Sequence, residues 1–432
     1  MDKINAADTA WVLAATTLVM LMVPGLAIFY GGMVRARSVL NTMMMTFVTL
    51  GIVTVVWVGW GYSLAFGKDH GPGLIGGFGQ VGLKDTMVQV YGTIPTPVFA
   101  MFQLMFALVT CALVSGSIVD RAKFGTWCVF TVIWTTVVYV PEAHWVFFSD
   151  GGKGGWLIDR MHVFDFAGGT AVEINSGASG LALALILGPR LGWKKDPMRP
   201  HNLPLVMLGA GLLWFGWFGF NAGSALGANA QAGLALANTQ IAGALGVVGW
   251  LAVERLRDGT FTSFGAASGA VAGLVAITPA CASITPVGAI AVGTVAGAVC
   301  SFAVTLKYRV GYDDSLDVAG VHMIGGIVGL LMIGLVCSAQ ATGILNSHRG
   351  VDGLLYGGGL QQLGRQAVAV GAAFGYSFTV TLLIGWVLHK TLGFRVERDH
   401  EISGVDLALH AEAAYELAPA GASTGRMAGS HD

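Results

Sequence analysis

The chain is poor in charge. Asp, Glu, Lys and Arg together make up 11% of its 432 residues, whereas a soluble domain usually carries about 25%. The formal net charge is −1, so the chain lacks the basic excess that typifies nucleic-acid-binding proteins. This composition argues against a soluble globular domain, and we expect no nucleic-acid partner.

Cysteine is also scarce, and no residues group into a reactive set. The five cysteines all lie inside apolar runs, at no metal-ligand spacing, which indicates small buried side chains and not a disulfide framework. No nucleophile–base pair is recognisable either, so an intramembrane enzyme is a remote alternative. We therefore expect no metal, no cofactor and no enzymatic activity. The cysteines are Cys111, Cys128, Cys281, Cys300 and Cys337.

Long apolar runs dominate what is present. Hydrophobic residues make up 54% of the chain, and runs of 18 or more recur, which is typical of membrane-spanning helices. We predict an all-α polytopic membrane protein with eleven transmembrane helices. The predicted spans are 9–33, 40–66, 97–119, 124–148, 164–188, 204–226, 234–254, 260–280, 286–306, 316–337 and 367–389.

The distribution of basic residues predicts the topology. The first apolar stretch is too long for a signal-peptide core and no small-residue cleavage site follows it, so we expect a retained first span. With the N-terminus outside, the inside loops and the start of the tail hold fifteen Lys and Arg, against seven in the outside segments. The positive-inside rule therefore favours an N-out/C-in, multi-pass protein.

The first ten spans divide into five plus five, and a final helix follows them. An odd repeat unit places the two halves in opposite orientations, the inverted-repeat plan of many transporters. In span five Asp165 precedes Glu173 by eight residues, and at the start of span ten Asp314 precedes His322 by the same spacing. We therefore expect Glu173 and His322 to meet across a pseudo-twofold axis near mid-membrane.

Ionisable residues inside membrane helices are costly and usually face a partner or an aqueous cavity. Glu173 and His322 are therefore candidates for a proton or cation relay, with a structural hydrogen-bonded pair as the alternative. Asp165 begins its helix, and an N-cap is at least as good an interpretation of it as a functional carboxylate. Its charge would in either case attract cations.

Two aromatic motifs stand at helical spacing. "FQLMF" puts Phe102 and Phe106 on one helix face, and "GWFGFNAGS" supplies Trp217, Phe220 and Ser224. Such stripes are more often packing than site. Aromatic faces can nevertheless hold a desolvated cation, with about 2 kcal/mol or more.

Taken together, these motifs resemble the ammonium transporter (Amt/Mep/Rh) family, in particular its bacterial Amt branch. The resemblance covers nearly the whole chain through "PGLAIFYGGMVR", "FQLMFALVT", "DFAGGTAVEIN", "GWFGFNAGSALGAN", "GAVAGLVAITPA" and "DVAGVHMIGGIVG", in the family's order. It implies a homotrimer in the bacterial plasma (inner) membrane, with one hydrophobic pore per subunit.

The resemblance also implies roles for individual residues. Ammonium would be recruited at an outer vestibule by Phe147, Ser224 and Asp165, with Trp145 nearby. The stacked rings of Phe106 and Phe220 would close the pore, and Phe102 and Trp217 would line it.

Two positions depart from the usual family pattern. Glu173 stands where the first of two histidines is usual, with His322 as the second, and Phe147 stands where tryptophan is common. We expect NH4+ to be deprotonated near the gate, NH3 to cross the apolar segment, and Glu173 with His322 to relay the proton. A passive channel for neutral NH3 (or CO2) and an ammonium sensor remain alternatives, although the short tail argues against a sensor.

The C-terminal part changes in composition. We divide the chain into a transmembrane domain, residues 1–390, and a cytoplasmic regulatory tail, residues 391–432. Its first part can form short helices, and "APAGASTGRMAGSHD" is typical of a disordered end. Asp406, His410 and Tyr415 resemble family tail positions, although Ala411 stands where glycine is frequent. The resemblance implies binding of a PII-type signalling protein, with a plain structural tail as the alternative.

Overall fold

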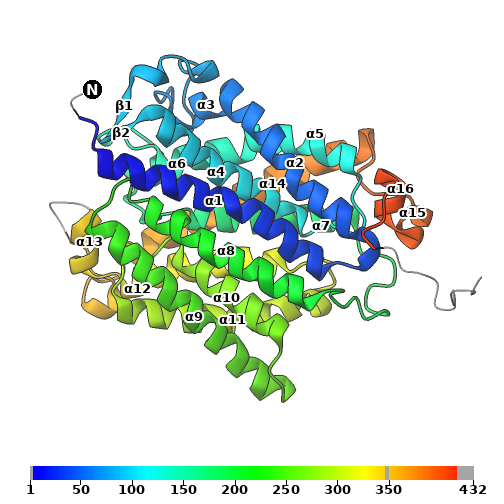
Figure 1. Cartoon of the computed structure of the whole chain (residues 1–432). Helices are drawn as coiled ribbons and strands as arrows, with labels where there is room; N and C mark the ends of the chain where they lie inside the picture. Colours follow the sequence, from blue (N-terminus) through cyan, green and yellow to red (C-terminus); the bar gives the residue numbers. More distant parts are fainter. Residues whose placement is uncertain (1–2, 346–349, 416–432) are drawn as a thin grey trace, which may run out of the picture.

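The computed structural model describes residues 3–345 and 350–415, and this part of the chain is a bundle of long helices (Figure 1). Its only strands there, β1 (Val90–Tyr91) and β2 (Ile94–Pro95), form one antiparallel hairpin. The first half contains α1 (Ala6–Met33), α2 (Val39–Val56), η2 (Trp57–Gly61), α3 (Tyr62–Phe66), α4 (Thr96–Ser115), α5 (Phe124–Trp134), η5 (Thr135–Tyr139), α6 (Val140–Phe147), η7 (Gly169–Ile174) and α7 (Asn175–Leu187).

The second half repeats this arrangement with fewer interruptions. It contains α8 (Leu203–Gly223), α9 (Ala230–Asp258), α10 (Ser263–Ile277), α11 (Pro286–Val310), η8 (Ala319–Met323) and α12 (Ile324–Val336). Then come α13 (Ala339–Leu345), the long α14 (Gln361–Thr391), and the tail helices α15 (Arg398–Ser403) and α16 (Val405–His410). Short helical turns occur in the connections: η1 (Ala36–Ser38), η3 (Val81–Leu83), η4 (Thr86–Val88), η6 (Trp156–Arg160) and η9 (Leu354–Tyr356).

Ten of the eleven predicted spans coincide with helices that are long and apolar enough to cross a membrane. The exception is α10, at the predicted span 260–280, which has 15 residues. At 1.5 Å per residue this helix is about 22 Å long, short of the roughly 30 Å hydrocarbon core. The all-helical membrane fold is therefore confirmed in the described residues, whereas the count of eleven spans and the orientation stay predictions.

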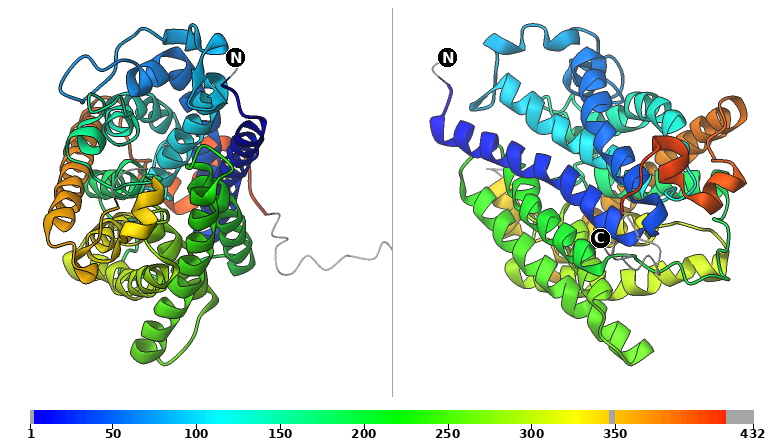
Figure 2. Two further views of the ribbon diagram at one scale, coloured as in Figure 1. Left: turned by 90° about the vertical axis from the view of Figure 1, so that its left-hand side faces the viewer. Right: turned by 45° about the vertical axis from the view of Figure 1, so that its right-hand side comes forward.

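The two halves pack in a reciprocal way. α1 lies along α8, the first long helix of the other half, and α7 contacts η8 while α12 contacts η7. Viewed nearly along the helices, the N-terminal half in blue and cyan lies beside the C-terminal half in green and yellow (Figure 2). This exchange of partners is what a pseudo-twofold axis between inverted repeats requires.

Glycine permits the closest helix contacts. A Cβ added to Gly246 of α9 would lie 2.3 Å from the carbonyl oxygen of Gly269 on α10. No side chain fits at that separation, so only glycine lets the two backbones touch.

The two ends of the bundle differ. One end carries the start of α1 and the β1–β2 hairpin, and the opposite end carries α15 and α16 (Figure 1). At the end that carries the tail helices, Arg190 forms a bidentate ion pair with Asp313, with Nη2–Oδ1 at 2.8 Å and Nε–Oδ2 at 2.9 Å. Burial of Asp313 opposes its charge, but the hydrogen bonds and charge of Arg190, aided by the charge of Arg121, outweigh it and lower the pKa of Asp313.

Candidate functional site

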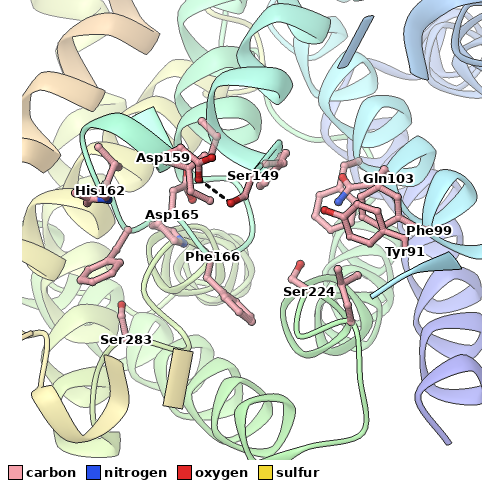
Figure 3. A pocket seen from close by; sticks show the side chains of 18 residues that line it. Tyr91, Phe99, Gln103, Ser149, Asp159, His162, Asp165, Phe166, Ser224 and Ser283 are labelled. Carbon is pink, nitrogen blue, oxygen red and sulfur yellow. Dashed lines mark hydrogen bonds between the residues drawn. The ribbon is translucent and has the colours of Figure 1, made fainter. Parts of the chain in front are cut away.

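Three cavities follow one another through the bundle. Eight of the predicted site residues line the first two, namely Phe106, Phe147, Asp165, Ser224, Glu173, Trp217, Phe220 and His322, whereas Phe102 and Trp145 do not. The first cavity, of about 370 Å³, opens at the end that carries the β1–β2 hairpin. Phe147, Asp165 and Ser224 line it, as does Phe106 at its base. Figure 3 shows Asp159 and Asp165 on one side, with Tyr91, Phe99 and Gln103 on the other and Ser224 between them. The residues expected to form a vestibule are therefore brought together, with one exception.

That exception is Trp145, which is not among the residues lining the first cavity. Its indole Nε1 donates to the carbonyl oxygen of Leu74 at 2.9 Å, and its ring packs against Trp156 and Tyr376. Residues two apart on a helix point to different faces. Phe147 and Trp145 therefore cannot both face the cavity, and Phe147 is the one that does.

Both carboxylate oxygens of Asp165 accept hydrogen bonds from residues that follow it in the chain. Oδ1 accepts from the backbone N–H groups of Gly168 and Gly169 at 2.9 and 2.6 Å. Oδ2 accepts from the backbone N–H and the hydroxyl of Thr170 at 2.7 and 2.5 Å. This is the capping geometry that satisfies free amides at a helix start. Asp165 can therefore act on a cation through its field, while its lone pairs are occupied.

Asp159 contributes a second negative charge to the first cavity. Its carboxylate accepts from the Ser149 hydroxyl and from the backbone N–H groups of Asp150, Gly152 and Gly154, at 2.6 to 3.1 Å. Partial burial acts to raise its pKa, but these hydrogen bonds outweigh burial, so the pKa of Asp159 lies below its usual value. The group stays ionised at neutral pH.

A pair of phenylalanine rings separates the first cavity from the second. Phe106 lines the first cavity, Phe220 lines the second, and their ring centroids are 4.2 Å apart with planes inclined by 32°. Phe102 packs against Phe106 at 5.0 Å, and Trp217 packs against Phe220 at 5.8 Å. Aromatic rings in this range are in direct contact. The passage is closed to a hydrated ion.

The second cavity is small and almost wholly apolar. Its volume is about 10 Å³, and its lining is aliphatic and aromatic except for Glu173 and His322. That volume holds about one water molecule. Its lining residues are Met22, Leu26, Phe29, Val109, Leu113, Glu173, Leu213, Trp217, Phe220, Val271 and His322.

Glu173 and His322 meet directly in this cavity. Glu173 Oε2 and His322 Nδ1 are 2.8 Å apart, and the two residues are 1% and 5% exposed. The other carboxylate oxygen, Oε1, is buried and has no hydrogen-bond partner in the part of the chain that the structure describes. Such an oxygen costs free energy unless it binds a proton or a ligand.

Both residues sit on wide, π-helical turns at matching places in the two halves. η7 carries Glu173, and η8 carries His322. Asp165 Oδ2 accepts from the N–H of Thr170, five residues on, and Asp314 Oδ2 accepts from the N–H of Ala319, also five residues on, each at 2.7 Å. π-turns inside helices are rare and frequent at functional sites. The local geometry is thus repeated in both halves, beyond the shared spacing of acid and ionisable residue.

Sequence reasoning missed several residues of the first cavity. Tyr91, Gln103, Asp159 and His162 all line it. Tyr91 lies on the β1–β2 hairpin, and its ring stacks on Phe99 with centroids 3.7 Å apart. Gln103 follows Phe102 in the quoted "FQLMF" motif, and a polar residue there was the one available signal.

The third cavity, of about 540 Å³, lies at the end of the bundle near the tail helices. Arg190, Lys194, Lys195 and Lys307 line it with Asp196 and Asp317. Its lining therefore carries four basic and two acidic side chains. The first cavity, by contrast, is lined by Asp159 and Asp165 and by no lysine or arginine among the described residues.

The first part of the tail folds against this end. Asp406 accepts from the N–H groups of Leu40 and Asn41, at 3.0 and 2.8 Å, near the start of α2. His410 Nε2 lies 3.0 Å from the Asn41 side-chain oxygen, and the Tyr415 hydroxyl lies 2.9 Å from His201 Nε2. The predicted short helices are confirmed as α15 and α16, while the end predicted to be disordered lies outside the described residues.

The chain is similar to known proteins over most of its length. Residues 10–415 match the model of the Ammonium Transporter Family. An ammonium transporter of Mycobacterium tuberculosis (strain ATCC 25618 / H37Rv) is 51% identical, with 97% of this chain and 92% of that protein covered. An ammonium transporter of Bacillus subtilis (strain 168) is 44% identical, with 95% and 98% covered.

The fold is also similar to that of solved structures. Mep2 of Saccharomyces cerevisiae superposes with a TM-score of 0.84 at 33% identity, with 92% of this chain and 89% of that chain covered. A structure described as a sensor Amt protein superposes with a TM-score of 0.85 at 29% identity, with 93% and 98% covered.

Proposed function

Because the chain belongs to the ammonium transporter family, we propose that it moves ammonium by splitting NH4+ into NH3 and a proton at the Phe106–Phe220 pair. The observation that carries this mechanism is the 2.8 Å contact between Glu173 and His322, in an apolar cavity directly beyond the closed rings. A proton acceptor in such a place has no packing purpose that an apolar side chain would not serve better.

Recruitment takes place in the first cavity. The Phe147 face and the Ser224 hydroxyl contact NH4+, and the negative charges of Asp159 and Asp165 raise its local concentration. Phenylalanine is a weaker cation-binding face than tryptophan. The two carboxylates offset this weakness over a longer range.

Deprotonation follows from the cost of dehydration. The rings of Phe106 and Phe220, 4.2 Å apart, leave no room for the hydration shell of an ion. An ion transferred bare into an apolar passage pays a large desolvation penalty, whereas neutral NH3 pays little. NH3 therefore crosses the segment lined by Trp217 and Leu213, and the proton travels separately.

Glu173 and His322 carry that proton. Glu173 Oε1 is free to accept it, and Oε2 already contacts the imidazole, which can take it up in turn. A carboxylate stabilises a protonated imidazole beside it. The pair holds a charge of zero or minus one throughout, so no net positive charge is left in the apolar cavity.

The test is current from purified protein in proteoliposomes on a solid-supported membrane after an ammonium pulse. A positive current, absent from protein-free liposomes and not evoked by K+, is the expected result. Internal alkalinisation without current would instead identify a passive channel for NH3. Ammonium binding with neither signal would identify a sensor.

Three finer assignments belong to the same proposal. The protein is a homotrimer, it lies N-out/C-in in the bacterial plasma membrane, and residues 1–390 form its transmembrane domain. The relatives named above are transporters, which is consistent with a non-enzymatic function.

Residues 391–432 form a cytoplasmic tail that a PII-type signalling protein recognises. Contacts of Asp406, His410 and Tyr415 with the helix bundle support a docked tail. Truncation at Gly393 should abolish co-purification of the PII protein with the transporter. Undiminished binding would show that the tail is only structural.

A further inference from the structure

The third cavity continues the line of the second. On α1, Met22, Leu26 and Phe29 line the second cavity, and Met33, one further turn along the same face, lines the third. On α10, Val271 lines the second cavity, and Phe264, seven residues earlier, lines the third. Residues at these spacings share one helix face. The third cavity is therefore the far mouth of the passage that begins at the first.

A lysine ammonium group is built into this far mouth. Lys307 Nζ lies 2.6 Å from Asp317 Oδ1 and donates to the backbone carbonyl of Asp314 at 3.0 Å. It also lies 5.5 Å from the centre of the Tyr308 ring. Lys307 is 6% exposed, so its charge is held in place.

These contacts are the ones that a free ammonium ion would make. A carboxylate, a carbonyl oxygen and an aromatic face are all acceptors for N–H donors that carry positive charge. Asp317 adopts the left-handed conformation, with φ of 63°. Aspartate is among the non-glycine residues that adopt this conformation most often, so it is the 2.6 Å contact with Lys307 that fixes the place of the carboxylate.

We propose that the far mouth contains a binding site for monovalent cations which Lys307 fills with its own ammonium group. Ammonium that leaves the pore finds this site taken and diffuses away, and cations on that side cannot bind at the mouth and block it. The inference rests on the proposed transport function, because it assigns a role at the exit of that pore.

Removal of the lysine charge should open the site to ions. Lys307→Met leaves the Asp317 carboxylate, the Asp314 carbonyl and the Tyr308 ring without their cation. K+ is the probe, because its size is close to that of NH4+ and it does not change the ammonium gradient. A partly exposed ion pair contributes up to about 1 kcal/mol, which corresponds to about fivefold in binding.

The experiment uses right-side-out membrane vesicles that carry the full-length protein and are loaded with K+ or choline. Ammonium-evoked current is measured against internal K+ concentration. For Lys307→Met we expect half-inhibition at a K+ concentration up to about fivefold below the wild-type value. Lys307→Arg keeps a cation in place and should behave as wild type, and Lys194→Gln removes an exposed charge from the same cavity as a matched control.

The double variant Lys307→Met/Asp317→Asn removes the site itself and should restore wild-type insensitivity to internal K+. If Lys307→Met does not reach the membrane, Lys307→Gln serves, because it keeps a neutral N–H donor beside Asp317 while it removes the charge. Equal K+ sensitivity in wild type and in either neutral variant would overturn the proposal. Absence of ammonium current in the wild type would instead refute the transport function on which it rests.

Discussion

Replacement of Glu173 by glutamine separates the shape of the Glu173–His322 pair from its ability to exchange a proton. The amide fits the same space and can keep one hydrogen bond to His322 Nδ1, now 2.8 Å from Glu173 Oε2. It cannot take up a proton at the position of Oε1, which has no other partner among the described residues. The change therefore removes proton exchange and little else.

The expected effect on transport is large and the effect on stability is small. General acid–base groups contribute about 10²–10⁴ in rate, so we expect the charge moved per ammonium pulse to fall by about 100-fold or more. A hydrogen bond to a charged group exceeds a neutral one by about 1 kcal/mol. Thermal unfolding in detergent should therefore change by only a few degrees.

The assay is solid-supported membrane electrophysiology, combined with a pH dye inside the liposomes. Glu142→Gln is the matched control, because Glu142 is also a buried glutamate in a membrane helix but bonds to Ser377, away from the cavities. Loss of current with retained alkalinisation would mean that NH3 still passes and that Glu173 carries the proton. Unchanged current in Glu173→Gln, at equal amounts of protein in the membrane, would refute the relay.

Four further changes test other parts of the site and the fold. Phe220→Leu opens the contact with Phe106 at 4.2 Å, so K+ should now evoke a current where the wild type gives none; continued exclusion of K+ would remove the rings as the barrier. Asp165→Ala leaves three backbone N–H groups without their acceptor, at about 1 kcal/mol or more each, so detergent melting should fall well below that of Asp165→Asn, and equal melting would deny the cap. The pKa of Asp313 is lowered in the folded protein, so its ion pair stabilises the fold at any pH above the pKa of an unfolded aspartate, about 4, and this stabilisation is lost as the pH falls below that value. Asp313→Asn should therefore flatten the decline in melting temperature below about pH 4, and a decline parallel to that of the wild type would count against this prediction. Ala411 has φ of 55° after α16, so Ala411→Gly should slow proteolysis of the tail by relieving about 1 kcal/mol of strain, and faster cleavage would contradict this.

The ionisable residues of the site could be predicted from the sequence, because a charged side chain inside an apolar run carries a free-energy cost that needs an explanation. Glu173 and His322 stand in apolar runs, where only a partner or a cavity makes a charge tolerable. The repeated spacing from Asp165 and Asp314 then predicted that they would meet, and they do so at 2.8 Å. The aromatic motifs gave Phe106 and Phe220 only through resemblance to the family, since packing stripes have the same spacing.

Other features could not be predicted from spacing. The π-turns η7 and η8 depend on how the acid side chains bind backbone amides five residues on, which helical periodicity does not encode. Tyr91 enters the first cavity because its hairpin folds back over α4, a contact between distant segments. The end of α10 at Ile277 has a local signal in Pro279, since a proline disfavours helix at the residue before it, but the apolar composition that continues past Ile277 led to a longer predicted span.

Under the proposed mechanism, the arrangement of charges along the passage accounts for a glutamate paired with a histidine beside the Phe106–Phe220 rings. The first cavity is lined by two acids and no lysine or arginine among the described residues, whereas the third has four basic side chains against two acids. A cation is thus attracted to the first cavity and disfavoured in the third. In the apolar segment between them NH4+ must give up its proton, because a bare ion pays a large desolvation penalty there. A pair of neutral histidines would become positive on taking a proton, but a carboxylate with a histidine becomes neutral. Under the proposed mechanism, the Glu173–His322 pair therefore accepts the proton without creating an isolated positive charge in the apolar cavity, which is the state that low dielectric penalises most.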